Sequence, residues 1–137
     1  MLKKLEHVGI AVEDLDRALE VYQETLGLAP DEVLEVPERG IKIAFFTLGQ
    51  VQLELLASTR EGSDIGNFLQ KRGPGLHHLA FLVDDVAAAL GRLKEKGIRL
   101  IDETPKRGGR GNRIAFVHPK SIGGVLVELC EKHEQCE

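Results

Sequence analysis

The sequence predicts an α+β fold made of two tandem βαβββ modules within one domain, residues 1–137. The length of 137 residues fits one domain. Segments with strand and helix periodicity follow each other in the same order twice along the chain. The halves also align residue by residue, since His7 matches His78 and, at the same offset, Asp14 matches Asp85. Two copies indicate a duplication, and because each copy alone would be marginally stable, the modules should share a sheet or core.

The first module, about residues 1–61, begins with a strand over 5–12, in which bulky and small residues alternate. A helix follows over 14–27, because apolar residues recur at helical spacing and Gly27 is a natural stop. Its apolar stripe consists of Leu15, Leu19, Tyr22 and Leu26. Three strand candidates complete the module, over 28–36, 41–48 and 51–57.

A polar, glycine-rich segment over about 62–73 is predicted to link the modules, with a short helix around Ile65, Phe68 and Leu69. The second module, about residues 74–137, then repeats the pattern. Its expected elements are a strand over 76–83, a helix over 84–97, and strands over 98–104, 112–118 and 124–131. The basic stretch over 105–111 is predicted to be a flexible loop.

Alternation along the strands places the two equivalent histidines on faces with small neighbours. In the first strand His7 shares its face with Gly9, whereas the bulky residues of the strand face the expected helix. In the strand over 76–83, His78 shares its face with Ala80. The adjacent His77 falls on the helix-packed face, so it is expected to be structural.

A glutamate stands at the equivalent position in the last strand of each module. Glu54 lies in "VQLELL" and Glu128 in "VLVELC". A carboxylate in so apolar a run is costly to bury unless it is paired or binds a metal. The simplest solution is one divalent metal bound by His7, Glu54, His78 and Glu128, a ligand set that suits zinc, nickel, cobalt, manganese or iron. Gln52 shares the face of Glu54 and is the alternative ligand at that position.

Paired modules with ligands on the first and last strand of each resemble the vicinal oxygen chelate superfamily. Within it, the sequence is similar to the methylmalonyl-CoA epimerase family through "HVGIAVEDLDRALEVYQETLG", "ELLAS", "GLHHLAFLVDD" and "GGRGNRIAFVHPKSIGGVLVEL". This resemblance covers nearly the whole chain. It implies an open, eight-stranded, cup-like barrel around a metal site. The metal positions of the family fall on His7, Glu54, His78 and Glu128, in agreement with the alternation.

The resemblance also implies an isomerase of the racemase and epimerase class, which interconverts (2R)- and (2S)-methylmalonyl-CoA in propionate metabolism. One divalent ion per chain, expected to be cobalt with zinc, nickel or manganese as alternatives, would stabilise the enolate. Glu128 is expected to be the catalytic base as well as a ligand. Some relatives carry a second carboxylate three residues after a glycine. Here Gly40 is followed by Ile43 at that position, so the acid on the second face stays unassigned.

Basic residues gather around the long loop of the second module, and the phosphates of coenzyme A are groups that such residues bind. The expected substrate-binding residues are Lys106, Asn112, Arg113 and Lys120, and Arg107 and Arg110 belong to the same basic stretch. The alternative is that these charges only solvate the surface, which is common for lysine and arginine.

Three other functions share part of this pattern. A glyoxalase I-like lyase acting on a glutathione hemithioacetal also uses two histidines and two glutamates, but "HPKSIGGVLVEL" favours the epimerase. An extradiol dioxygenase uses two histidines and one carboxylate, whereas this chain offers two carboxylates. A metal-free binding protein of the superfamily would have lost ligands that this chain keeps.

The composition argues against two classes of partner. A formal net charge of −4 and the absence of tryptophan are unfavourable for nucleic-acid binding. No apolar stretch approaches the roughly 20 residues of a membrane span, and no signal segment precedes the first strand. With both cysteines expected as thiols, the prediction is a cytoplasmic protein. Open sheet edges further predict a homodimer.

Overall fold

The computed structural model describes residues 1–132 and contains two compact units. One unit consists of His7–His77, and the other combines Met1–Glu6 with the chain from His78 onwards. Apart from the first residues of the chain, each unit corresponds to one of the two predicted βαβββ modules.

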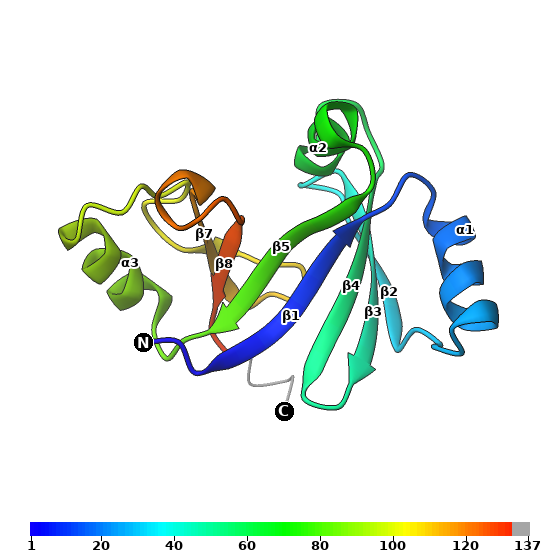
Figure 1. The fold of residues 1–137 in the computed structure, drawn as a ribbon, viewed down its shortest axis with the longest axis horizontal. Coiled ribbons are helices and arrows are strands. Elements are labelled where there is room, and N and C mark those ends of the chain that lie inside the picture. Colours follow the sequence, from blue (N-terminus) through cyan, green and yellow to red (C-terminus); the bar gives the residue numbers. More distant parts are fainter. Residues whose placement is uncertain (133–137) are drawn as a thin grey trace. The chain divides into compact units, whose positions relative to one another are not determined.

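The first module places its last strand beside its first. Its elements are β1 (Lys4–Ala11), α1 (Leu15–Glu20), a π-helical turn (Val21–Thr25), β2 (Glu32–Val36), β3 (Ile41–Leu48) and β4 (Val51–Ser58). The strand order is β2-β3-β4-β1. β3 pairs antiparallel with β2 and β4, and β4 pairs parallel with β1 (Figure 1). This parallel pairing brings residues far apart in sequence into register.

Helix α1 begins where its capping residue predicts. The side chain of Asp14 accepts a hydrogen bond of 3.2 Å from the backbone N–H of Arg17. The helix continues as the π-helical turn, and Gly27 follows with a φ of +70°, a conformation that glycine adopts without strain. Leu15 packs with Phe46 and Leu55 on one face of the strands. Ile10 and Val12 join this cluster, which confirms that the bulky face of β1 is covered by α1.

Helix α2 (Asp64–Arg72) forms within the segment predicted to link the modules. Buried Ser63 caps it by accepting a hydrogen bond of 2.9 Å from the backbone N–H of Gly66. Ile65 of α2 is completely buried in the second cluster of this module, where Phe68 and Leu69 also pack. The strand residues of that cluster are Ala11, Val36, Ile41, Ile43, Phe45 and Leu56. Because these residues alternate with those that face α1, they form the opposite, inner face of the first module.

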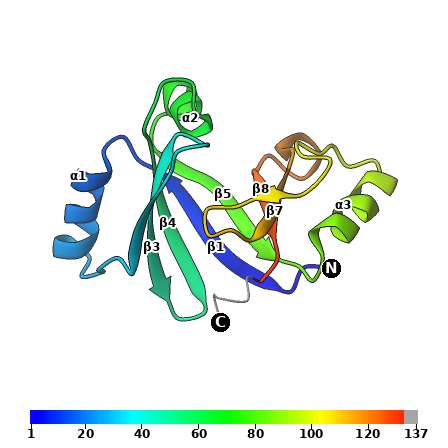
Figure 2. The same cartoon turned by 180° about the vertical axis from the view of Figure 1, so that it is seen from behind.

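The second module repeats the arrangement of the first. Its elements are β5 (Gly75–Leu82), α3 (Val86–Glu95), β6 (Lys106–Arg107), β7 (Arg113–Val117), a short 3₁₀ helix (Pro119–Ser121) and β8 (Val127–Cys130). The strand order is β5-β8-β7-β6, with β5 and β8 parallel and the other pairs antiparallel. Helix α3 lies beside β7 and β8 (Figure 2), and its buried Leu90 packs with Ala115 and Leu129.

The prediction of a strand over 98–104 is wrong. This segment makes only an isolated bridge, between Leu100 and Val117. The reason lies at Asp102, whose carboxylate accepts a hydrogen bond of 2.7 Å from the backbone N–H of Phe116. A side chain thus takes the place of a backbone partner, and the ladder stops. The second strand of the module is instead Lys106–Arg107, inside the stretch predicted to be a flexible loop.

The inner face of the second module carries smaller and aromatic residues. Ala80, Ile114, Phe116 and Cys130 form a buried cluster, with Leu82 and Leu126 packed against it. Cys130 is buried there, and Cys136 lies outside the described residues. Because these positions alternate with those that pack on α3, this face is equivalent to the inner face of the first module.

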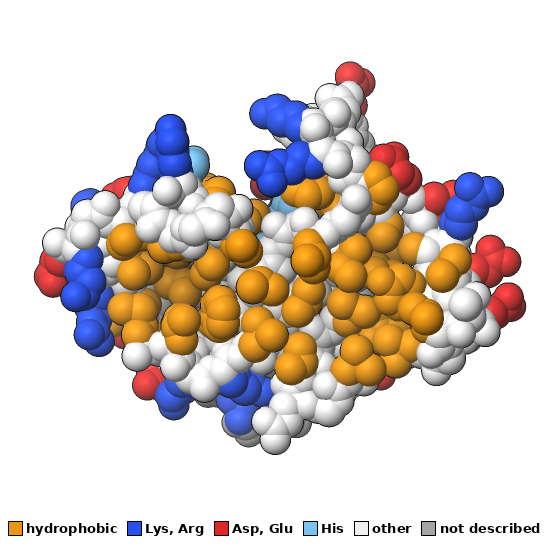
Figure 3. Space-filling view, viewed as in Figure 1, with side chains coloured by type: hydrophobic (Ala, Val, Ile, Leu, Met, Phe, Trp, Pro, Cys, Tyr) orange, Lys and Arg blue, Asp and Glu red, His pale blue; other side chains and the backbone are white. Residues whose placement is uncertain are grey.

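Many apolar side chains stay near the surface. Figure 3 shows them gathered on the displayed face of the molecule. Among those at least partly exposed are Val21, Leu26 and Leu48 in the first unit, and Ile101 and Val125 in the second. Within residues 1–132, none of the helices has the length and apolar character needed to cross a membrane.

Candidate metal centre and substrate site

The first module holds a buried histidine–glutamate pair. In the parallel pairing of β1 with β4, His7 is opposite Gln52 and Gly9 is opposite Glu54. The Nε2 atom of His7 lies 3.4 Å from Oε2 of Glu54. The two residues are only 5% and 8% exposed. The carboxylate of Glu54 is thus in close contact with the imidazole of His7.

The second module holds the equivalent pair. The Nε2 atom of His78 lies 3.3 Å from Oε1 of Glu128, and the residues are 3% and 5% exposed. Ala80 is opposite Glu128 in the parallel pairing of β5 with β8. The ring of Phe116 meets the His78 ring edge-on, with centroids 5.8 Å apart. His78 is thus fixed between a carboxylate and an aromatic ring.

The two histidine–glutamate pairs arise from the same strand register. In each module, the glutamate is opposite the residue that follows the histidine by two positions, Gly9 or Ala80. Both of those residues are small, so the imidazole and carboxylate are not crowded by their strand neighbours. By alternation from the clustered residues on their own strands, all four residues lie on the inner faces of their modules.

The chemistry of these donors fits a divalent metal. Buried carboxylates are costly unless they are paired or bind a metal. Imidazole nitrogen and carboxylate oxygen are ligands that divalent transition metals accept. His7, Glu54 and His78 all offer such ligand atoms and are buried. Glu128 offers the same kind of atom beside His78.

His77 has a different environment from its neighbour. Its ring meets Phe68 of α2 edge-on, with centroids 4.9 Å apart and planes at 82°. The predicted structural role is thus supported by an aromatic contact. The contact is to α2 of the first module, although the sequence suggested packing on the same face as Leu79.

The predicted substrate-binding residues do not all lie on one face of the second module. Lys106 of β6 is opposite Ile114, a residue of the inner face. Its Nζ atom lies 4.9 Å from the centroid of the Phe116 ring and 3.4 Å from Oδ1 of Asp102. Arg113 precedes Ile114 and therefore points to the other face, where it lies 3.7 Å from Glu131.

The other two candidates are held by backbone contacts. The side chain of Asn112 donates a hydrogen bond of 3.4 Å to the backbone carbonyl of Glu131. Its Oδ1 atom lies so close to Gly108 that a Cβ at that glycine would come within 2.6 Å. Lys120 is exposed in the 3₁₀ helix, where its backbone N–H donates to Nδ1 of His118. His118 is therefore a capping residue.

Two residues of this region were missed from the sequence, Asp102 and Phe116. Asp102 reads as part of a strand, and its bonds to β7 and to Lys106 depend on tertiary structure. Phe116 follows the alternation of β7 and could have been placed on the inner face by its spacing from Ile114.

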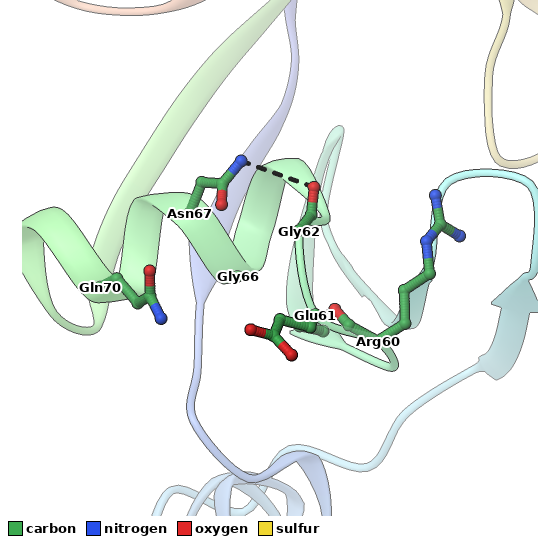
Figure 4. A pocket seen from close by; sticks show the side chains of 7 residues that line it. Arg60, Glu61, Gly62, Gly66, Asn67 and Gln70 are labelled. Atoms are coloured by element: carbon green, nitrogen blue, oxygen red, sulfur yellow. Dashed lines mark hydrogen bonds between the residues drawn. The ribbon is translucent and has the colours of Figure 1, made fainter.

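A cavity of about 380 Å³ lies elsewhere in the first unit, between the end of β4 and α2 (Figure 4). It is lined by Ser58, Arg60, Glu61, Gly62, Gly66, Asn67 and Gln70. The guanidinium of Arg60 donates to the backbone carbonyl of Pro37 at 2.7 Å, which holds the side chain against the 37–38 turn. The hydroxyls of Ser58 and Ser63 are 2.6 Å apart beside it.

Residues 6–116 match the family described as Glyoxalase/Bleomycin resistance protein/Dioxygenase superfamily, and the chain belongs to this superfamily. A relative in Cereibacter sphaeroides, the ethylmalonyl-CoA/methylmalonyl-CoA epimerase, is 42% identical over 94% of this chain and 98% of its own. The solved methylmalonyl-CoA epimerase of Mycobacterium tuberculosis is 43% identical, with a TM-score of 0.90 over 98% of this chain and 91% of its own.

A further solved methylmalonyl-CoA epimerase, in complex with methylmalonyl-CoA and NH4+, is 38% identical with a TM-score of 0.91. It matches 98% of this chain and 97% of its own. These similarities confirm the resemblance stated from the sequence. They also confirm the predicted fold class, the α+β fold of tandem βαβββ modules that the superfamily shares.

Proposed function

We propose that this chain is a methylmalonyl-CoA epimerase, which interconverts the (2R) and (2S) forms of its substrate. The observation that carries the proposal is the presence of two equivalent, buried histidine–glutamate pairs on the inner faces of the modules. The supporting similarity extends over nearly all of the chain, and one related epimerase was solved with methylmalonyl-CoA.

His7, Glu54, His78 and Glu128 together would hold one divalent metal ion per chain. Cobalt is the expected ion, with zinc, nickel and manganese as alternatives, because this donor set is permissive. When bound, such an ion acts as a Lewis acid that favours the negative charge of an enolate. The pairing within each module supports this proposal, since each module supplies one imidazole and one carboxylate in the same register.

Glu128 is proposed as the base. Its carboxylate is buried beside His78 and can take the α-proton that lies between the thioester and the carboxylate of the substrate. The C–H electron pair then moves into the enolate, and return of a proton to the opposite face completes the epimerisation. Ile43 cannot supply that proton, because it is an alkyl side chain buried in the apolar inner cluster of the first module.

The remaining substrate contacts stay proposals. Arg113 and Lys120 are exposed cations in the second unit and are available to phosphates of coenzyme A. Asn112 is half-buried at the base of the same loop and would position that loop. Lys106 differs from both, because its ammonium lies between Asp102 and the ring of Phe116.

A homodimer is also proposed. The partly exposed apolar side chains of both units, such as Leu26 and Val125, offer surface that a second copy would cover. Light scattering should then give twice the mass of the chain, and a monomer mass would contradict this. A cytoplasmic location stays a prediction from the sequence.

The experiment that tests the function uses stereochemically pure methylmalonyl-CoA in deuterium oxide with the cobalt-loaded protein. Deuterium should appear at the α-carbon, and the opposite epimer should accumulate. A parallel reaction with a glutathione hemithioacetal tests the alternative of a glyoxalase I-like lyase, which shares the donor set. If no deuterium exchange were seen with cobalt, zinc, nickel or manganese, the epimerase proposal would be contradicted.

A further inference from the structure

The inner face of the second module carries a fixed positive charge. Lys106 is 3.4 Å from Asp102, and its Nζ atom lies over the ring of Phe116 at 4.9 Å from the centroid. Its side chain is 39% exposed, whereas that of Asp102 is 16% exposed. A lysine that only solvates a surface is mobile, but this ammonium is held by an anion on one side and an aromatic face on the other.

The strand register places this charge on the same face as the proposed base, two strands away, with Phe116 of β7 between them. Lys106 is opposite Ile114 in the pairing of β6 with β7, and Phe116 is opposite Glu128 in the pairing of β7 with β8. All these side chains are on the inner face. The ring under the ammonium is also the ring that contacts His78. A single aromatic side chain therefore separates Lys106 from the His78–Glu128 pair.

Asp102 fixes this arrangement from the backbone. Its Oδ2 atom accepts a hydrogen bond of 2.7 Å from the N–H of Phe116, while Oδ1 faces Lys106. The same carboxylate thus holds the strand that carries Phe116 and the ammonium above it. An ammonium has three N–H donors, and an ion pair with one carboxylate oxygen needs only one of them. Donors remain for a second anion.

We propose that Lys106 binds the free carboxylate of the malonyl-type substrate and that Asp102 is its positioning residue. This inference rests on the proposed epimerase function. The base must reach the α-carbon, and the substrate carboxylate is attached directly to that carbon. A group that binds this carboxylate must therefore share the inner face with Glu128, as Lys106 does. The phosphates of coenzyme A, in contrast, are separated from the α-carbon by the length of the pantetheine arm.

The test compares two esters that differ in this carboxylate. Malonyl-CoA carries it, and propionyl-CoA lacks it, while both have the same coenzyme A portion. In Lys106→Met, which keeps an apolar stem on Phe116, calorimetry on the cobalt-loaded protein should show malonyl-CoA binding about tenfold or more weaker. Propionyl-CoA binding should stay unchanged, and Lys106→Arg should restore most of the affinity for malonyl-CoA.

Lys94→Met is the matched control. Lys94 of α3 also forms an ion pair, 2.8 Å from Glu103, but its side chain is exposed. This variant should bind both esters like the wild type. Asp102→Asn, which keeps an oxygen for the N–H of Phe116 and loses the charge, should weaken malonyl-CoA binding alone by a few-fold. It also provides the same comparison if Lys106→Met does not fold.

Several results would overturn the inference. If Lys106→Met bound both esters more weakly to the same extent, Lys106 would be assigned to the coenzyme A portion. If it bound both as the wild type does, Lys106 would have no role in recognition. If the wild type bound neither ester and exchanged no deuterium, the epimerase proposal would fail as well. If the wild type exchanged deuterium while Lys106→Met bound both esters normally, only the role of Lys106 would be lost.

Discussion

At the scale of single residues, the adjacent histidines of β5, His77 and His78, have different surroundings. His78 faces Glu128 and the ring of Phe116, whereas His77 faces Phe68 of α2. Alternation along β5 explains the difference, because neighbours on a strand point to opposite faces. Counting from Ala80 therefore predicts which histidine of "LHH" lies on the inner face. The aromatic partner of His77 could not be predicted from the sequence, since it depends on where α2 packs.

The first prediction separates these two histidines. His78→Ala should lower cobalt affinity by about 100-fold or more and abolish metal-dependent exchange, because it removes a proposed ligand. His77→Ala should keep the activity and lower the free energy of unfolding by about 1 kcal/mol, through loss of the contact to Phe68. Calorimetry with cobalt and urea denaturation measure the two effects. The reverse pattern would mean that the register of β5 is shifted by one residue.

The second prediction separates the two glutamates. Glu128→Gln should lower the exchange rate by about 100- to 10,000-fold, because an amide cannot accept the α-proton as a base. Glu54→Gln should reduce it far less, since the amide oxygen can still serve as a ligand. Isotope exchange followed by mass spectrometry measures both rates. Equal losses would indicate that Glu128 acts only as a ligand, or that Glu54 is itself a base.

At the scale of elements, side-chain hydrogen bonds set several boundaries. Apolar alternation correctly predicted β3 and most of β1, β4 and β7. The same alternation suggested a strand over 98–104, where the carboxylate of Asp102 takes the N–H of Phe116 instead. Such a bond joins residues that the sequence separates, so periodicity cannot reveal it. The two-residue β6 was missed for a related reason, because two residues carry no period.

The third prediction concerns the start of α2. Ser63 is buried, caps the helix through Gly66 and lies 2.6 Å from the hydroxyl of Ser58. Ser63→Ala should cost about 2 kcal/mol, because it removes the cap and leaves a partly buried hydroxyl with a lost partner. Asp85→Ala, which removes the exposed cap of α3, should cost about 1 kcal/mol. Urea denaturation of both variants measures this difference, and equal costs would argue against a role for the Ser58 contact.

At the scale of the whole molecule, duplication is what the sequence revealed most reliably. The equivalence of His7 with His78 and of Glu54 with Glu128 predicted one set of four ligands, and within each module the histidine and the glutamate lie together. The predicted basic cluster was less successful, since Lys106 and Arg113 face opposite sides of their strands. Ligands inside regular strands follow a period, whereas residues of a glycine-rich loop do not.

The fourth prediction counts metal ions. If the two pairs share one ion, the wild type should bind one cobalt per chain, and either His7→Ala or His78→Ala should remove it. Independent pairs would instead retain one ion in each single variant. Equilibrium dialysis with elemental analysis gives the number directly. Cobalt should also raise the melting temperature of the wild type by mass action, and chelators should lower it.

The pairing of first and last strands within each module also has a consequence for how the chain matures. His7 meets Glu54, and His78 meets Glu128, only after an entire module has closed a parallel pairing between distant segments. Contacts of such long sequence separation form slowly. During synthesis the first pair can assemble while Glu128 is still unmade. The nascent chain can therefore hold one finished half-site, and a metal shared by both pairs would be acquired only after the second module has folded.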